Sequence, residues 1–89
     1  MKPEENKYNN PKNPLHSIEW GKSTWDNKSF SIRNRYNLEN GKFNKAGSGE
    51  IPWEDFKKMI VESIKRDYFS SKEIGLLLKT ISEKLLSDE

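Results

Sequence analysis

The chain has 89 residues, which fits one domain with a single and only marginally sufficient hydrophobic core. It has no cysteine, which excludes disulfides and thiolate metal sites, and no apolar run approaches the roughly 20 residues of a membrane-spanning helix. Charged residues make up 34% of the chain, but the net charge of +2 is too small to indicate a class of partner. Residues 1–5 have no apolar signal-peptide region, so we expect a soluble protein in the cytoplasm of its own cell or of a host.

The composition predicts a folded chain with a thin core. Hydrophobic residues are 31% of the sequence, and aromatic residues, at 11%, offset this low share because each buried ring removes a large area from water. We therefore expect one small domain over residues 15–89. A homodimer formed through its helices would extend the core.

Residues 1–14 are predicted as a flexible tail. They hold three prolines and four asparagines, and Tyr8 is their one aromatic residue. Each proline removes a backbone donor, and a segment so poor in apolar residues cannot bury itself. Contact with a partner is the alternative, since disordered termini sometimes fold on binding.

The first strand is predicted over residues 15–24. Ile18 and Trp20 fall on one side of it and Glu19 on the other. Residues 25–28 are polar and turn-forming, so they are expected to reverse the chain.

The central strand is predicted over residues 29–36. Phe30 and Ile32 alternate with Arg33 and Arg35, and a side-chain period of two is typical of a half-buried strand. We expect its apolar side to be dry under the helices, and its arginine side to be open to solvent and cationic.

The pair Asn40-Gly41 predicts a tight turn of type I′, whose two central residues need positive φ. A third strand over residues 42–45 would follow, antiparallel to the second, with Phe43 facing inward. Residues 46–49, with two glycines, are expected to be a flexible joint.

Two helices are predicted to follow, over residues 52–67 and 71–86. Apolar residues recur at helical spacing in both, and Ser70 with Glu73 forms the pattern of a capping box before the second. Leu76 and Leu86 lie off the second apolar stripe and are either exposed or part of a dimer interface. The expected fold is therefore α+β: a three-stranded antiparallel meander followed by two helices packed on one face, βββαα.

The sequence offers few groups for catalysis. His16 is the single histidine, expected at a surface or edge position, and residues 47–49 form a short glycine loop without the lysine of a nucleotide-binding loop. No nucleophile–base set or metal-ligand pattern is present. We expect neither an enzyme nor a bound cofactor or metal.

A binding surface is predicted on the arginine side of the sheet. Arg33 and Arg35 project the same way, about 7 Å apart given the strand rise. Cationic groups beside an aromatic ring are what single-stranded nucleic acid uses, through phosphate contacts and base stacking. The alternative is that alternating charges merely keep an exposed sheet face soluble. The candidate site residues are Lys22, Trp25, Arg33, Arg35, Lys42 and Lys45.

Part of the chain resembles the core of the transcriptional positive cofactor four family. The resemblance is carried by residues 32–36 (IRNRY), 40–42 (NGK) and 46–51 (AGSGEI), and by the helix with aromatic residues that follows them. The resemblance covers about residues 29–60. It implies single-stranded DNA binding on a curved sheet and a helix that dimerises. It would place Arg33 and Arg35 on the binding strand, and Lys42 and Lys45 at its edge.

Two functions follow as hypotheses. The first is a nucleic-acid-binding or transcription-regulatory module, acting through the basic sheet face. The alternative is a protein-binding regulator or inhibitor of the kind that phages and plasmids carry, for example an anti-CRISPR protein, that occludes a host protein handling nucleic acid. In that case Trp25, Trp53 and Arg35 are the residues suited to an interface.

Overall fold

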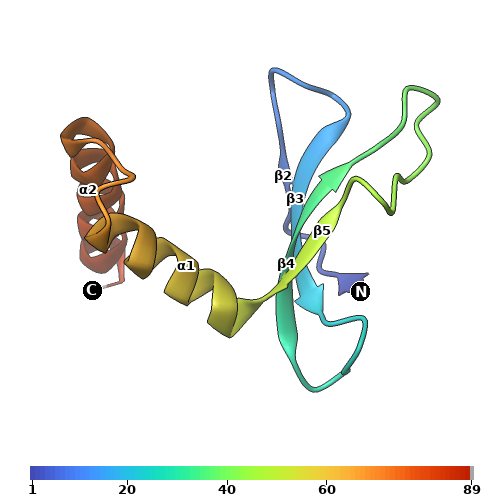
Figure 1. Cartoon of the computed structure of the whole chain (residues 1–89), viewed down its shortest axis with the longest axis horizontal. Helices are drawn as coiled ribbons and strands as arrows, with labels where there is room; N and C mark the ends of the chain where they lie inside the picture. Colours follow the sequence, from blue (N-terminus) through green and yellow to red (C-terminus); the bar gives the residue numbers. More distant parts are fainter. Residues whose placement is uncertain (89) are drawn as a thin grey trace. The chain divides into compact units, whose positions relative to one another are not determined.

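The computed structural model describes residues 1–88 and confirms an α+β fold, in which an antiparallel five-stranded sheet precedes two helices (Figure 1). The strands are β1 (Lys2–Pro3), β2 (Tyr8–Asn9), β3 (His16–Lys22), β4 (Phe30–Tyr36) and β5 (Gly49–Pro52). The helices are α1 (Trp53–Lys65) and α2 (Ser71–Ser87). The chain divides into two compact units, the sheet unit (Met1–Phe56) and the helical unit, which begins at Lys57.

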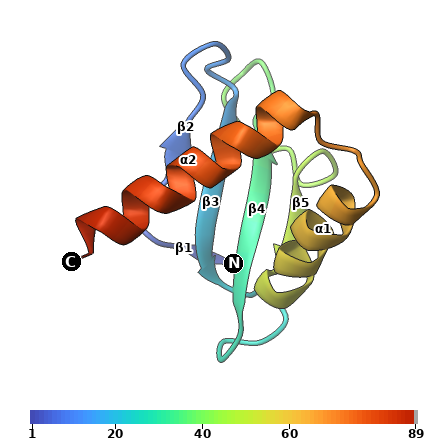
Figure 2. The same ribbon diagram turned by 90° about the vertical axis from the view of Figure 1, so that its left-hand side faces the viewer.

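The hairpin of β3 and β4 is the centre of the sheet unit. Its register places Glu19 opposite Arg33 and Gly21 opposite Ser31, and β5 pairs with the other edge of β4. The strand order is β1-β3-β4-β5, and β2 also pairs with β3. Figure 2 shows β1 and β2 along the same edge of β3. The strands predicted over residues 15–24 and 29–36 are confirmed.

Part of the segment expected as a tail, residues 1–14, is paired with the sheet. Besides the β1 and β2 ladders, the Glu4 amide donates to the Trp20 carbonyl at 2.7 Å, and the Asn10 amide to the His16 carbonyl at 3.1 Å. This pairing needs only the backbone groups on the edge of β3, so an apolar pattern is not required. Gly21 permits it, because a Cβ there would lie 2.1 Å from the Lys2 carbonyl oxygen.

The third strand lies later in the chain than predicted. Residues 42–45 contribute only one bridge, from Phe43 to Asn37, and β5 occupies the place expected for them. The Asn44 amide donates to the Tyr36 carbonyl at 3.2 Å, and the Asn44 side chain accepts a hydrogen bond from the Gly47 amide at 3.1 Å, so that a turn follows at once. The joint predicted at residues 46–49 is tied down, because the Ser48 hydroxyl bonds both the amide and the carbonyl of Tyr36.

The turn at Asn40-Gly41 is present, but it is not of type I′. Gly41 has φ +84°, whereas Asn40 is not among the residues with positive φ. The Leu38 amide donates to the Lys42 carbonyl at 2.7 Å, and the Gly41 amide to the Leu38 carbonyl at 2.8 Å. Three residues, 39–41, therefore close the loop, and this loop length commonly ends on a left-handed glycine.

The prediction that the arginine side of the sheet is open to solvent is wrong. Glu19, which shares that side, is 1% exposed, and Ser31 and Arg33 are also buried. On the other side Ile32 is buried as expected, but Phe30 is 39% exposed. We call the side of Glu19 and Arg33 the polar face; the loop between β4 and β5 lies over part of it.

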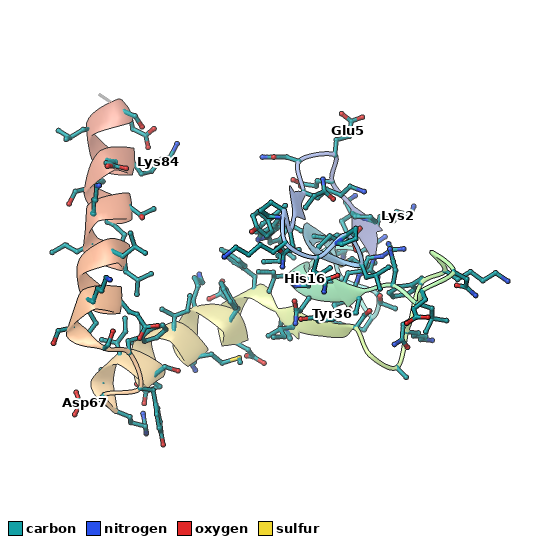
Figure 3. The ribbon with its side chains drawn as sticks, turned by 90° about the horizontal axis from the view of Figure 1, so that it is seen from above. Lys2, Glu5, His16, Tyr36, Asp67 and Lys84 are labelled. Carbon is teal, nitrogen blue, oxygen red and sulfur yellow. The ribbon has the colours of Figure 1, made fainter. Side chains whose placement is uncertain are left out.

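Both helices form where local patterns predict them, and the capping box of α2 is confirmed. The Ser70 side chain accepts from the Glu73 amide, and the Glu73 carboxylate accepts from the Ser70 amide. After α1, Asp67 adopts φ +63° and the Tyr68 amide donates to the Ser63 carbonyl at 3.1 Å, which ends the helix. Figure 3 labels Asp67 at the turn between α1 and α2.

The helical unit has no core of its own. Within the described residues, no side chain of α1 or α2 is buried, and the two helices do not pack along their lengths. That they cover one face of the sheet stays a prediction. Neither helix is long and apolar enough to cross a lipid bilayer, as far as residues 1–88 are concerned.

Candidate functional site

A carboxylate shared by two guanidinium groups lies at the centre of the polar face. Arg33 donates to Glu19 Oε1 from Nε at 2.9 Å and from Nη2 at 2.7 Å. Arg35 donates to the same oxygen from Nη1 at 3.4 Å, and its Nε donates to Asn37 Oδ1 at 3.0 Å. The β3–β4 register creates this cluster, because residues two apart on β4 share the face that Glu19 occupies on β3.

The ring of Phe43 covers both arginines. Its centroid lies 4.7 Å from Arg33 Cζ and 4.5 Å from Arg35 Cζ, which is cation–π distance. The prediction that Phe43 faces an apolar core is therefore wrong. The loop that replaces the expected third strand brings the ring onto the polar face instead.

Beside this cluster the polar face is hollowed, with a volume of about 690 Å³, and every lining residue belongs to the sheet unit. Both arginines are among them, but their exposure differs. The Arg33 side chain is 10% exposed and the Arg35 side chain 26%. The lining residues are Met1, Pro3, Thr24, Trp25, Arg33, Arg35, Phe43, Lys45, Ser48 and Glu50. Of the predicted site residues, the structure thus brings together Trp25, Arg33, Arg35 and Lys45.

The other two predicted residues lie elsewhere. Lys22 ends β3 opposite Phe30, on the other side of the sheet, and it borders a separate concavity of about 300 Å³. Lys42 follows the tight turn; its amide donates to Asn40 Oδ1 at 3.0 Å, and it does not line the hollow.

Trp25 is exposed at the rim, on a loop ordered by its neighbour Asp26. The Asp26 carboxylate accepts from the Lys28 amide at 2.9 Å and from the Ser29 hydroxyl at 2.8 Å. These two hydrogen bonds, the first the stronger influence, lower the pKa of Asp26 below its usual value. Trp25 therefore stands directly before an ordered turn at the edge of the hollow.

Glu19, Phe43 and Glu50 are the charged and aromatic residues of the site that were not found from the sequence. The other lining residues that were not found are Met1, Pro3, Thr24 and Ser48. The Glu50 carboxylate accepts from the Thr24 amide at 3.2 Å and from the Thr24 hydroxyl at 3.0 Å, which ties β5 to the end of β3. The predicted hairpin, closed by residues 24 and 29, would have placed Glu19 opposite Asn34, whereas the observed register differs by one residue and places it opposite Arg33. No comparable signal identifies Glu50, because its strand was not predicted.

His16 lies away from the hollow. Its ring stacks on Tyr36 with centroids 4.6 Å apart, and the two side chains are neighbours in Figure 3. Nδ1 lies 3.0 Å from Asn10 Nδ2, and Nε2 lies 2.6 Å from Asn34 Oδ1. These contacts join β3 to β4 and to the loop after β2. Among residues 1–88, no group of three or more His, Asp or Glu side chains is placed to hold a metal ion.

Comparison of the chain with protein-family models, with curated proteins and with solved structures finds no match. The candidate function therefore depends on the geometry of the polar face.

Proposed function

We propose that this chain is a small, non-enzymatic module that binds single-stranded nucleic acid, DNA in particular, in the hollow of its polar face. One observation carries the proposal: the hollow gathers the cations of Arg35 and Lys45 and the rings of Trp25 and Phe43. Cations that contact phosphates beside rings that stack on bases are the usual means of holding single strands. The resemblance to the positive cofactor four family supports the same ligand class.

The two arginines have different roles in this proposal. Arg33 is buried and gives two N–H groups to Glu19, so it positions its neighbours and does not contact the ligand. Arg35 is more exposed, and its Nη1 lies farther from the Glu19 carboxylate, at 3.4 Å. Its guanidinium group is therefore better placed to contact a phosphate of the ligand. Because one carboxylate serves two guanidinium groups, the cluster keeps an excess of positive charge.

The size of the hollow limits what enters it. Its volume of about 690 Å³ falls within the range of sites that enclose a small molecule, roughly 300–1,000 Å³. We expect one base to enter with its phosphate, while neighbouring nucleotides remain on the rim.

The first test measures binding of a labelled single-stranded oligonucleotide by fluorescence anisotropy at several salt concentrations. Each phosphate contact on a single strand contributes about −0.7 to the slope of log K against log salt, so two contacts predict a slope of about −1.4. A duplex of the same sequence is the control for ligand form and is expected to bind more weakly, since its bases are already stacked.

Single substitutions test the residues. Trp25→Ala is expected to weaken binding about fivefold to 150-fold, since base–aromatic stacking contributes about 1–3 kcal/mol. Lys45→Ala is expected to weaken binding and make the salt slope shallower by about 0.7. Lys12→Ala, which removes an exposed lysine outside the hollow, is the matched control and is expected to change neither.

The proposal fails if wild type binds no oligonucleotide, or if Lys12→Ala weakens binding as much as Lys45→Ala does. The first result would leave the protein-binding hypothesis as the alternative. The second would indicate unspecific attraction to a weakly basic chain.

A further inference from the structure

Helix α2 carries an apolar stripe that helix α1 leaves open. Ile74, Leu78, Ile81 and Leu85 lie on one side of the helix, and their exposed fractions run from 38% to 66%. Leu77 is half-buried beside them, and no residue of α2 is buried. A single 17-residue helix is marginally stable in water, and most helical stability comes from packing of the apolar side. This stripe therefore requires a cover.

The four residues of the stripe have the same sequence spacing whether they are read from the N-terminus or from the C-terminus of α2. Ile74, Leu78, Ile81 and Leu85 are separated by four, three and four residues. Alternating steps of three and four form the seam of a coiled coil. If two copies of α2 lie antiparallel about a two-fold axis, Ile74 of each copy faces Leu85 of the other, and Leu78 faces Ile81. The stripe is thus complementary to itself.

The residues at the two ends of the seam select the orientation. Ser71 precedes Ile74 by three residues, and Asp88 follows Leu85 by three, so both continue the stripe. In a parallel pair the Asp88 carboxylates of the two copies would face each other and repel. In an antiparallel pair each Asp88, which Lys84 of its own helix contacts at 3.2 Å, lies at the N-terminus of the other α2, where the amides that the capping box does not bond favour a negative charge.

We propose that α2 pairs with α2 of a second copy of this chain, antiparallel, along the seam from Ser71 to Asp88. These residues lie outside the region that resembles the positive cofactor four family, and the proposal does not depend on nucleic-acid binding. The pairing removes the stripe from water and doubles the chain into a symmetric particle with two polar faces.

The first experiment measures mass in solution by light scattering over a dilution series. Wild type is expected to have twice the chain mass of 10.5 kDa. The double variant Leu78→Asp with Ile81→Asp is expected to have the mass of a single chain, because its dimer dissociation constant is raised at least 100-fold. Leu76→Asp is the matched control: Leu76 is 64% exposed on the opposite side of α2, so the dimer is expected to persist. A monomeric wild type, whether α2 is covered by its own chain or by another protein, would overturn the proposal.

The second experiment tests the orientation, and it uses the absence of native cysteine. Ser71→Cys combined with Asp88→Cys is treated with a short thiol-reactive cross-linker and is expected to give a covalent dimer. Ser71→Cys alone and Asp88→Cys alone are expected to stay uncoupled, because like positions of an antiparallel pair are about 25 Å apart at 1.5 Å per residue. Efficient coupling of either single variant would indicate a parallel pair and overturn the assignment.

Discussion

The sheet unit and the helical unit are stabilised in different ways. In the sheet unit the most buried side chains are polar, and Glu19, Ser31 and Arg33 all have partners there. In the helical unit no residue of α2 is buried, and its local order begins with the hydrogen bonds of Ser70 and Glu73. The first unit depends on contacts between strands, whereas the second depends on its cap and on whatever covers its apolar stripe.

Ion pairs show the same contrast. Glu19 accepts from two arginines in a buried place, whereas the Glu62 pair with Arg66, at 2.9 Å, is exposed on α1. An exposed i,i+4 pair contributes about 0.3–0.5 kcal/mol, but breaking a buried pair costs about 3–5 kcal/mol because a charge is left unpaired. Equal chemical changes in the two units should therefore have unequal effects.

The largest effect is expected from Glu19→Gln, which removes one charge with little change of shape. The substitution leaves two guanidinium groups without a carboxylate, so we expect the free energy of unfolding of the sheet unit to fall by about 3 kcal/mol. Urea unfolding followed by tryptophan fluorescence measures it. Glu62→Gln on α1 is the matched control and should change stability by about 0.5 kcal/mol or less. Equal effects of the two substitutions would contradict the contrast between the units.

Replacement of a glycine by alanine is expected to have opposite signs in the two units. Gly21→Ala would place a Cβ 2.1 Å from the Lys2 carbonyl oxygen, so β1 must move, at a cost of about 1–3 kcal/mol. Gly75→Ala on α2 meets nothing within 4 Å and should stabilise the helix by about 1 kcal/mol. Thermal unfolding measures the sign, and hydrogen exchange at the Glu4 amide reports release of β1. Unchanged protection of that amide in Gly21→Ala would argue against the pairing of β1.

Loss of the α2 cap is expected to cost about 1 kcal/mol, since Ser70→Ala removes the acceptor of the Glu73 amide. Far-UV circular dichroism should show reduced helix content and an earlier thermal transition. Ser82→Ala, within the same helix, is the control and should not reduce helicity, because alanine is the better helix former. A loss of helicity in both variants would indicate that the cap is not the cause.

The parts that the sequence predicts well are those that depend on near neighbours. The boundaries of α2 follow from Ser70, Glu73 and the apolar period, and the alternation of β4 places Arg33 and Arg35 on one face. The burial of that face depends instead on Phe43, whose bridge to Asn37 places its ring over the two arginines. Contacts of this kind join distant residues and leave no periodic signal.

The candidate site divides in the same way. Arg33 and Arg35 were found because a strand period fixes them relative to each other. Lys45 lines the hollow while Lys42 does not, and that difference is set by the loop, which propensities do not determine. The pairing of β1 and β2 was missed because an edge strand needs backbone partners and no particular side chains.

The smallest effect concerns two carboxylates, one in each unit, whose pKa values are both lowered by local hydrogen bonds. Asp26 accepts from Lys28 and Ser29, and Glu73 accepts chiefly from the Ser70 amide. Because the pKa is lowered in the folded state, the ionised carboxylate stabilises the fold at any pH above the pKa of the unfolded state, which is near 4.5 for Glu73. This stabilisation is lost as the pH falls through the lower pKa of the folded state. We therefore expect α2 helicity to decline in acid, and Glu73→Gln to decline less.

An NMR titration of the carboxyl groups separates the two sites. Ser70→Ala keeps the Ser70 amide, which is the main cause of the lowered pKa of Glu73, and removes the hydroxyl, which is the smaller cause. The pKa of Glu73 should therefore rise only part of the way toward its usual value, while that of Asp26 stays where it is. Both carboxylates are exposed, so added salt should screen the effect of distant charges on their pKa values. Salt should not remove the difference in Glu73 pKa between wild type and Ser70→Ala, because a hydrogen bond to the carboxylate acts at contact. A Glu73 pKa that is the same in wild type and Ser70→Ala would show that the Ser70 hydroxyl does not contribute to the lowered pKa, which would then depend on the amide of residue 70.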